Sequence, residues 1–391
     1  MYIDRMDTEE GPDEEQYLRS CFHTIIDDRV WVIGSYGQLN AVFSMNKELR
    51  DLRLAYDATV QECLTQEQRN QELYGCIKKK NHHIYLFPIM GLGIIDIDVI
   101  SGRQKRYNLK EWCKIDGPFY EPMDVKEYKG CFYLIPGYVQ YPLLKFDGAA
   151  VEECSGWKEQ VQEITGRKSG VLAFQCVLLA NKLYTLLHGS NKILCTDMET
   201  LEINTYDLPP QGYSFERLHY HNGKFWLIPG GRGEILSFSI EHGIEERFTI
   251  PDTFICSECH TFTNSFFYDN TMWIIPWMAK EILVLDLLSG CIEVLKFPEI
   301  MREQPFATDI PNVEAGFEDG RYLKLLACGG RYHCIIDMKD RKFVEVIDSH
   351  VPEECLRNNP DEISGRLNIW SRKYGTLDDF IAKVVQDTGT R

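Results

Sequence analysis

A short motif recurs along most of this 391-residue chain. A turn-forming residue is followed by an apolar strand with one aromatic residue near its centre, most clearly in Gly223–Pro229, Asn270–Pro276 and Gly130–Pro136. The aromatic residues recur at intervals of 42 to 54 residues and are Trp31, Tyr85, Tyr133, Tyr184, Trp226, Trp273 and Tyr322. A period of this size predicts an array of similar structural units.

Each unit carries the pattern of four short strands. Thirteen residues after the aromatic residue, or slightly displaced, a polar residue closes a second apolar run, and the set is Ser44, Asp98, Asp147, Asp197, Ser239, Asp286 and Asp337. A further apolar run follows each of them. Another strand precedes each aromatic strand across a two-residue turn such as Asn222-Gly223 or Asp269-Asn270, which is a hairpin signal.

A four-stranded unit cannot bury both of its faces alone, but units stacked around an axis can. We therefore predict an all-β protein, a single β-propeller of four-stranded antiparallel blades over residues 21–351. Seven copies favour seven blades. Because the first copy is the weakest, six blades with an N-terminal elaboration is the alternative.

Three segments break the repeat. Residues 1–20 predict an acidic flexible tail, and residues 57–72 predict a short helical insertion. Residues 352–391 form a C-terminal extension, in which Thr376 and Asp379 make a capping box for an amphipathic helix. Its apolar stripe is Leu377, Phe380, Ile381, Val384 and Val385. This helix either packs on the propeller rim or docks a partner.

The repeat resembles a known family. Gly223–Phe248 looks like a kelch repeat, in which a glycine and an aromatic strand lead to a diglycine and then to an aromatic–Asp strand, and Ile193–Leu208 matches its second half. The likeness covers about residues 21–348 and implies a propeller. Four copies depart from it by placing proline where the first glycine belongs, at Pro88, Pro136, Pro229 and Pro276. Some kelch-like propellers are copper oxidases, but no such ligand set matches here.

Charge and composition exclude several classes of function. The net charge of −17 argues against nucleic acid as a partner, because phosphate binding needs clustered cations. No apolar run is long enough for a transmembrane helix, so no membrane role is expected. The acidic N-terminus is the opposite of a secretory signal, which favours the cytoplasm. The 14 cysteines are then expected as reduced, mostly buried thiols, among them Cys76, Cys131, Cys176, Cys195, Cys291, Cys328 and Cys334.

Strand order places the loop after each aromatic strand and the loop between successive blades at one end of the channel. We call this end the loop face. Large aromatic and cationic side chains on loops are typical of a binding surface. The ligand-binding candidates are Tyr36, Tyr138, Tyr141, His188, Arg232, Trp277, Lys280 and Arg331. The structural alternative is that several of these rings only cover neighbouring blades.

The strands predicted to line the channel carry polar groups that could perform acid–base chemistry on a bound small molecule. The catalytic candidates are Glu216, His260, Asp124 and Glu314. Cys256, Cys259 and His260 spell a Cys-x-x-Cys-His motif, which can attach haem or provide half of a zinc site, with His219 and His221 as further zinc candidates. Attachment of haem normally needs export and structural zinc needs four ligands, so we predict no metal and no cofactor.

Two functions remain. The favoured hypothesis is a non-catalytic binding or scaffold module that holds a protein segment or a saccharide on the loop face. The alternative is an enzyme acting on a sugar-like or other polar small molecule at the channel mouth. The fold does not choose between them, but the absence of phosphate-loop, nucleophile-elbow and metalloprotease motifs favours binding.

Overall fold

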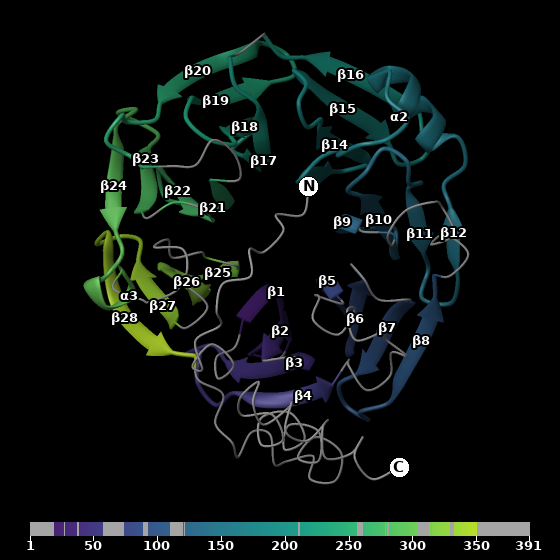
Figure 1. Ribbon diagram of the computed structural model, residues 1–391, viewed down its shortest axis with the longest axis horizontal. Coiled ribbons are helices and arrows are strands. Elements are labelled where there is room, and N and C mark those ends of the chain that lie inside the picture. The colour runs from purple at the N-terminus through teal and green to yellow at the C-terminus, as the bar shows by residue number, and fades with distance from the viewer. Residues whose placement is uncertain are drawn as a thin grey trace, which may run out of the picture.

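Seven sheets stand around a central axis in the computed structural model, each forming one blade of a ring (Figure 1). The structure describes residues 19–26, 28–36, 39–57, 74–88, 93–109, 120, 122–209, 212–255, 261–277, 279, 281–302, 313, 315–328 and 332–349. The predicted all-β propeller is confirmed, and it has seven blades; the six-blade alternative is wrong. The predicted N-terminal tail (apart from Arg19 and Ser20, which begin the first strand), the 57–72 insertion (apart from Asp57) and the C-terminal helix lie outside the described residues.

Each blade is built from four consecutive antiparallel strands. Blades 1 to 4 contain β1 (Arg19–Ile26), β2 (Arg29–Tyr36), β3 (Leu39–Asn46), β4 (Arg53–Asp57); β5 (Tyr74–Lys80), β6 (His83–Pro88), β7 (Gly93–Asp98), β8 (Gln104–Asn108); β9 (Pro122–Tyr128), β10 (Cys131–Pro136), β11 (Leu144–Phe146), β12 (Val151–Glu153); β13 (Cys176–Leu179), β14 (Lys182–Leu186), β15 (Lys192–Asp197), β16 (Ile203–Asp207). Blades 5 to 7 contain β17 (Phe215–His221), β18 (Lys224–Pro229), β19 (Glu234–Ser239), β20 (Gly243–Thr249); β21 (Phe262–Tyr268), β22 (Thr271–Pro276), β23 (Glu281–Asp286), β24 (Ile292–Lys296); β25 (Ala315–Asp319), β26 (Tyr322–Cys328), β27 (Tyr332–Asp337), β28 (Lys342–Asp348). Two helices, α2 (Trp157–Thr165) and α3 (Glu299–Arg302), lie in connections between blades.

The first strand of each blade lines the axis and the fourth lies at the rim (Figure 1). The apolar core is divided among the gaps between blades, and seven separate clusters fill the seven gaps. Trp226 and Trp273, two of the repeated aromatic residues, are 4% and 0% exposed and lie in two of these gaps. The sequence repeat therefore marks the residues that join one blade to the next.

The repeated aspartate shapes the turn between the third and fourth strands. In five blades one carboxylate oxygen accepts hydrogen bonds from the amides two and three residues further on, at 2.7–3.3 Å, and these residues are Asp98, Asp147, Asp197, Asp286 and Asp337. In blade 5 the Ser239 hydroxyl accepts from the amide of His242. In blade 1 the corresponding hydrogen bond is made by Asn46 and not by Ser44: the Asn46 side-chain oxygen accepts from the amide of Arg50. Such side-chain-to-backbone bonds are a local turn device.

The prolines that depart from the kelch pattern end the second strand of four blades. Each pairs with the first strand beside a register shift, as Pro229 does with Phe215 and Pro276 with Phe262. Proline has no amide hydrogen, so it suits the end of a ladder. The two-residue turns predicted at Asn222-Gly223 and Asp269-Asn270 are confirmed, with φ of 49° at Asn222 and at Asp269.

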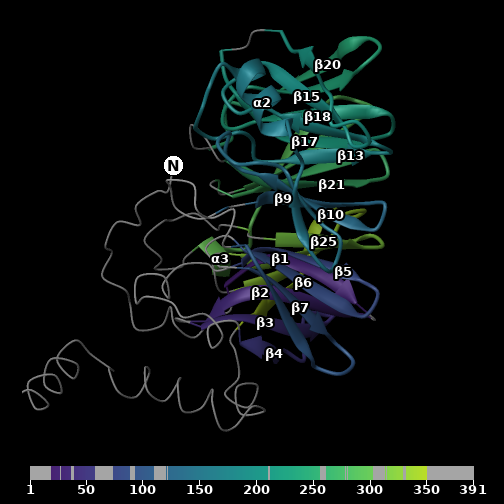
Figure 2. The ribbon, with the colours of Figure 1, turned by 90° about the vertical axis from the view of Figure 1, so that its right-hand side faces the viewer.

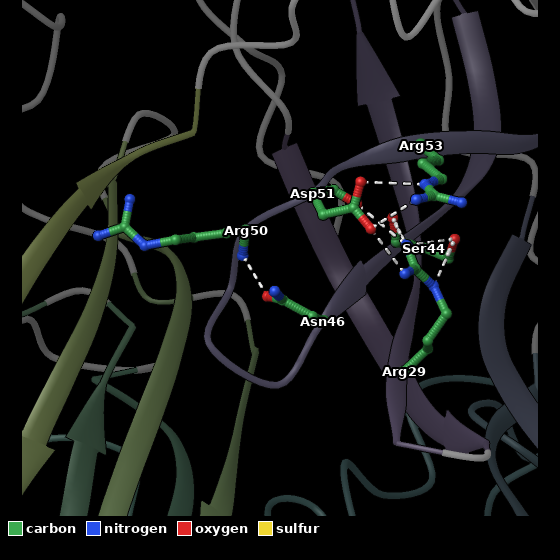
Figure 3. Close-up of polar contacts among 6 residues, drawn as sticks. All are labelled: Arg29, Ser44, Asn46, Arg50, Asp51 and Arg53. Atoms are coloured by element: carbon green, nitrogen blue, oxygen red, sulfur yellow. Dashed lines mark hydrogen bonds and ion pairs between the residues drawn. The ribbon is translucent and has the colours of Figure 1, made fainter.

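The ring closes without a shared strand, because blade 1 and blade 7 are each complete by themselves. Apolar packing joins them, through residues that include Phe43 and Leu49 of blade 1 and Leu326 and Ile347 of blade 7. The turn that carries Leu49 is braced by polar contacts (Figure 3). There Asp51 pairs with the guanidinium groups of both Arg29 and Arg53.

Polar contacts supplement this seam. Arg50 forms an ion pair with Glu345 of blade 7. Lys324 of blade 7 is almost fully buried and donates to the carbonyl of Lys47 in blade 1 at 2.5 Å and to Asp319 at 2.6 Å. The ion pair is exposed to water, so most of the closure free energy is assigned to the apolar contacts.

The eight cysteines whose side chains the structure describes are free thiols. Cys76, Cys176, Cys195, Cys328 and Cys334 are buried as predicted, and Cys131 is half-buried. The prediction of a buried thiol is wrong at Cys291, which is exposed, because it directly precedes the outermost strand β24.

The seam gives a first prediction. Leu326→Ala is expected to lower the free energy of unfolding by about 2–5 kcal/mol, because it leaves a cavity in the only packing that closes the ring among the described residues. Arg50→Ala is expected to cost about 1 kcal/mol or less, as exposed ion pairs do. Urea denaturation followed by tryptophan fluorescence measures both. Equal effects would contradict the assignment of closure to apolar packing.

The repeated aspartate gives a second prediction. The side chain of Lys182 and the amide of Glu199 lower the pKa of Asp197 from 3.8 to about 2. The folded state favours the charged carboxylate, so its stabilisation is present above pH 4 and is lost as the pH falls towards 2. Asp197→Asn keeps an acceptor oxygen but no charge. The difference in thermal unfolding midpoint between wild type and variant should therefore become smaller from pH 6 to pH 3. A difference that stays constant over this range would contradict a stabilising role for the charge of Asp197.

Candidate binding face and channel

A belt of backbone hydrogen bonds organises the loop face. The segments entering blades 4 and 6 lie between the loops of their own and the preceding blade. In blade 6 the Thr261 amide donates to the Gly230 carbonyl (2.8 Å) and the Trp277 amide donates to the Thr261 carbonyl (2.7 Å). The same belt includes Leu172 to Gly137, His188 to Leu172, Gly230 to Ser214 and Val313 to Pro276. Figure 2 shows α2 and α3 on this same side of the ring. Main-chain contacts thus bring His188, Trp277 and the loop of Arg232 to one face.

The face over blades 3 and 4 is closed by the segment that follows α2. Val171 bridges to Tyr138, and the Val139 amide donates to Gly170 at 2.9 Å. Tyr138 is half-buried, with its ring 6.4 Å from that of Tyr141. The expectation of an exposed ring at Tyr141 is wrong: it is 2% exposed and packs in the core between blades 2 and 3.

His188 is half-buried beside the channel mouth. Its ring stands edge-on to Phe174 with centroids 4.8 Å apart, and the Arg167 guanidinium donates to its carbonyl. The Phe174 ring also receives the Arg217 guanidinium at 5.7 Å, a cation–π contact. His188 and Phe174 therefore belong to a packed rim.

The face over blades 5 and 6 is the more open part. The Arg232 side chain is 62% exposed, and among the described residues its polar contacts are with the exposed Asp252, at 3.5 Å to the carboxylate and 3.3 Å to the backbone carbonyl. Ile255, in the next connection, is 65% exposed, and Ile300 on α3 is 56% exposed. Trp277 is half-buried, and its amide takes part in the belt. Along the chain it lies between the connection that carries Ile255 and the one that carries Ile300. Sequence reasoning missed both isoleucines, since exposure at the end of a connection has no residue signature.

Four predicted site residues lie outside the described residues, namely His260, Lys280, Glu314 and Arg331, as do Cys256 and Cys259. Tyr36 ends β2, at the loop face, and its side chain is not described. Among the residues that the structure covers, no group of three His, Cys, Asp or Glu side chains could hold a metal ion. No helix within that part of the chain is long and apolar enough to span a membrane.

Glu216 is on the innermost strand β17 and is 2% exposed. Its carboxyl group fills the space where a side chain at Gly230 would lie, because a Cβ there would come within 2.4 Å of it. Gly230, in the Pro229-Gly230 pair, thus makes room for Glu216. Next to it, Arg217 is also buried and donates to the Phe262 carbonyl of blade 6 at 2.9 Å.

A cluster of charged side chains lies in the channel, and we call it the channel cluster: Lys78 on β5, Asp124 and Lys126 on β9, and Cys176 on β13. Lys126 Nζ is 2.7 Å from Asp124 Oδ2, and Lys78 Nζ is 4.0 Å from Asp124 Oδ1. The Cys176 thiol is 3.5 Å from Asp124 Oδ2. Burial opposes ionisation of Asp124, but Lys126 and Lys78 outweigh it and hold its pKa below 3.8. Asp124 was predicted from sequence, whereas Lys78 was not among the predicted site residues.

Two buried histidines lie in the field of this cluster. Burial, followed by the charges of Arg217 and Lys126, lowers the pKa of His219 to about 3. Burial, followed by Lys78, lowers the pKa of His23 to about 4. Both rings are therefore neutral at physiological pH. His221, two residues after His219 on the same strand, stacks on Phe267 at 4.0 Å.

Comparison with known proteins shows the fold. No protein-family model and no curated protein sequence matches the chain. Virginiamycin B lyase from Staphylococcus aureus has a TM-score of 0.55 at 14% identity, over 80% of this chain and 92% of that one. YCF48 from Cyanidioschyzon merolae has a TM-score of 0.54 at 10% identity (80% and 92% covered), and Kluyveromyces lactis Hsv2 has 0.52 at 8% (84% and 98%). At these identities the likeness shows the propeller fold alone.

The histidines give a third prediction. Their pKa values are lowered on folding, so between pH 4 and 6.5 the unfolded chain binds protons that the folded chain does not. Stability is therefore expected to fall as the pH drops below 6.5. In an NMR titration from pH 8 to pH 5, the ring signals lost in His23→Gln and His219→Gln should not shift with pH. Titration of either ring near pH 6.5 would contradict the buried, electropositive setting.

Proposed function

We propose that this propeller is a non-catalytic binding module that recognises a protein segment on the loop face over blades 5 and 6. The observation that carries the proposal is the exposure of Arg232, Ile255 and Ile300 on the loops and connections of this part of the loop face, which also carries the half-buried Trp277. Arginine and tryptophan are the residues most often found at the energetic centre of protein interfaces.

The charge of this surface indicates the kind of segment. Asp252 is fully exposed and its bond to Arg232 is long, so a carboxylate of a partner can replace it at little cost. Ile255 and Ile300 add exposed apolar surface to the same part of the loop face. A segment that carries an acidic residue flanked by apolar ones fits both features. A saccharide, the other ligand considered from the sequence, has no group that matches the isoleucines.

The acid–base alternative has less support. Lys126 and Lys78 hold the Asp124 carboxyl group in its ionised form, which is unsuited to a general acid. His219 stays neutral with a pKa of about 3 and is a weak base. The remaining candidates, His260 and Glu314, lie outside the described residues, and Glu216 is packed against Gly230.

Two further points belong to the proposal. We infer a divergent kelch-like origin, supported by the repeated aromatic strands and by the glycine at position 230 that accommodates Glu216. We also place the protein in the cytoplasm, a proposal supported by the eight free thiols among the described residues.

The fourth prediction tests the face. Affinity capture from a native extract, read by mass spectrometry, would compare wild type with the Arg232→Ala, Ile255→Ala, Trp277→Ala triple variant. A protein enriched by wild type should be lost with this variant, since removing an interface centre typically costs about 2 kcal/mol or more per residue.

The matched control is Ile100→Ala with Leu288→Ala. Both side chains are exposed and lie in turns on the opposite face of the ring. This control should retain the partner. Loss of the partner from both variants, or from neither, would contradict binding at the loop face over blades 5 and 6. Circular dichroism of each variant would show that the propeller is intact.

A further inference from the structure

The channel cluster has the opposite charge to the protein as a whole. The chain has a net charge of −17, but in the cluster two ammonium groups, Lys78 and Lys126, face one carboxylate, Asp124. The neighbouring His219 and His23 rings are uncharged, so they do not change this balance of charges. Burial is the main cause of their lowered pKa values, followed by Lys78 for His23 and by Arg217 and then Lys126 for His219. The cluster therefore carries an uncompensated positive charge.

The Asp124 carboxylate already accepts three hydrogen bonds. Its Oδ1 accepts from the amide of Val125 at 2.7 Å, and its Oδ2 accepts from Lys126 and from the thiol of Cys176. Lys78, at 4.0 Å, is too far for a hydrogen bond to it. A carboxylate in this state does not satisfy the second ammonium group.

None of the three N–H groups of the Lys78 ammonium therefore donates a hydrogen bond to Asp124. Within the described part of the chain, its ammonium group has no hydrogen-bond acceptor, although β5 is an innermost strand. The side chain keeps 36% exposure and Lys126 keeps 26%, so small solutes in the channel can reach both. An ammonium ion at such a position is satisfied by water or by an anion.

His219 supplies a further polar group. It is 9% exposed, and its Nε2 has no hydrogen-bond partner among the described residues. Lys126 contributes, after burial and Arg217, to the lowered pKa of this ring. When Nε2 carries the ring proton, it can donate to an oxygen atom of a bound molecule.

We propose that the channel binds a small oxyanion, the carboxylate or phosphate group of a metabolite, between Lys78 and Lys126. Two oxygen atoms of such a group can each accept from one ammonium, which compensates the second positive charge that Asp124 leaves open. This site is separate from the loop face over blades 5 and 6 and uses none of its residues. It turns the predicted acid–base channel into a ligand pocket of defined charge.

The fifth prediction tests this site by isothermal titration calorimetry on the full chain, with inorganic phosphate and, separately, acetate as probes. Wild type should bind at least one of the two probes. Lys78→Met should weaken that binding about tenfold or more, because a charge-assisted contact is lost. Which probe binds more tightly decides between a phosphate and a carboxylate ligand.

The matched control is Lys79→Met. Lys79 is adjacent on the same strand, but it is exposed and its side chain points to the other face. This variant should bind like wild type. Equal loss in both variants would show general attraction to a basic surface and would overturn the proposal, as would no binding of either probe to wild type.

A second variant guards against misfolding. Lys78→Gln keeps a polar side chain of similar length without the charge, and it leaves the Lys126–Asp124 pair intact. Anion binding should fall while the thermal midpoint changes little. Unchanged binding in folded Lys78→Gln would also overturn the site. Capture of a partner at the loop face is expected to be unaffected, so the two proposals fail separately.

Discussion

Contact between neighbouring blades is the constraint on which this molecule depends. A four-stranded antiparallel sheet has two faces to cover, and each face here is covered by the next blade. No cluster of the core belongs to one blade alone. Removing one blade would expose the faces of two others, so the ring has to be complete before any blade is well packed. This is why closure between the first and last blades, without a shared strand, must be made by side chains such as Leu49 and Leu326.

The fold was largely predictable because its repeat is local and periodic. The aromatic residue, the turn and the aspartate recur in register, and each has one physical role: filling a gap between blades, reversing the chain, or binding two turn amides. Where the repeat weakens, the prediction was less secure. The first copy of the motif is the weakest, which left six blades as an alternative, and in blade 1 the turn is held by Asn46 and inserts Leu49 at the seam.

The candidate site was predictable only in outline. Topology indicated which loops share a face, and that holds because the belt joins those loops through the backbone. It did not separate Tyr141, which packs in the core, from Arg232, which is exposed, since both follow an aromatic strand at similar distances. Nor could it show that Lys78 reaches Asp124, because that pair joins two blades and no local pattern encodes it.

The belt has a consequence for how such a protein can change over time. Its donors and acceptors are main-chain groups, so they are present whatever side chains the loops carry. The positions of Arg232 and Trp277 can therefore be occupied by other residues while the scaffold beneath them stays the same, apart from sites such as Gly230 where a neighbour fills the space. In these loops the side chains determine recognition and the main chain maintains the architecture. Ligand specificity can therefore diverge faster than the fold.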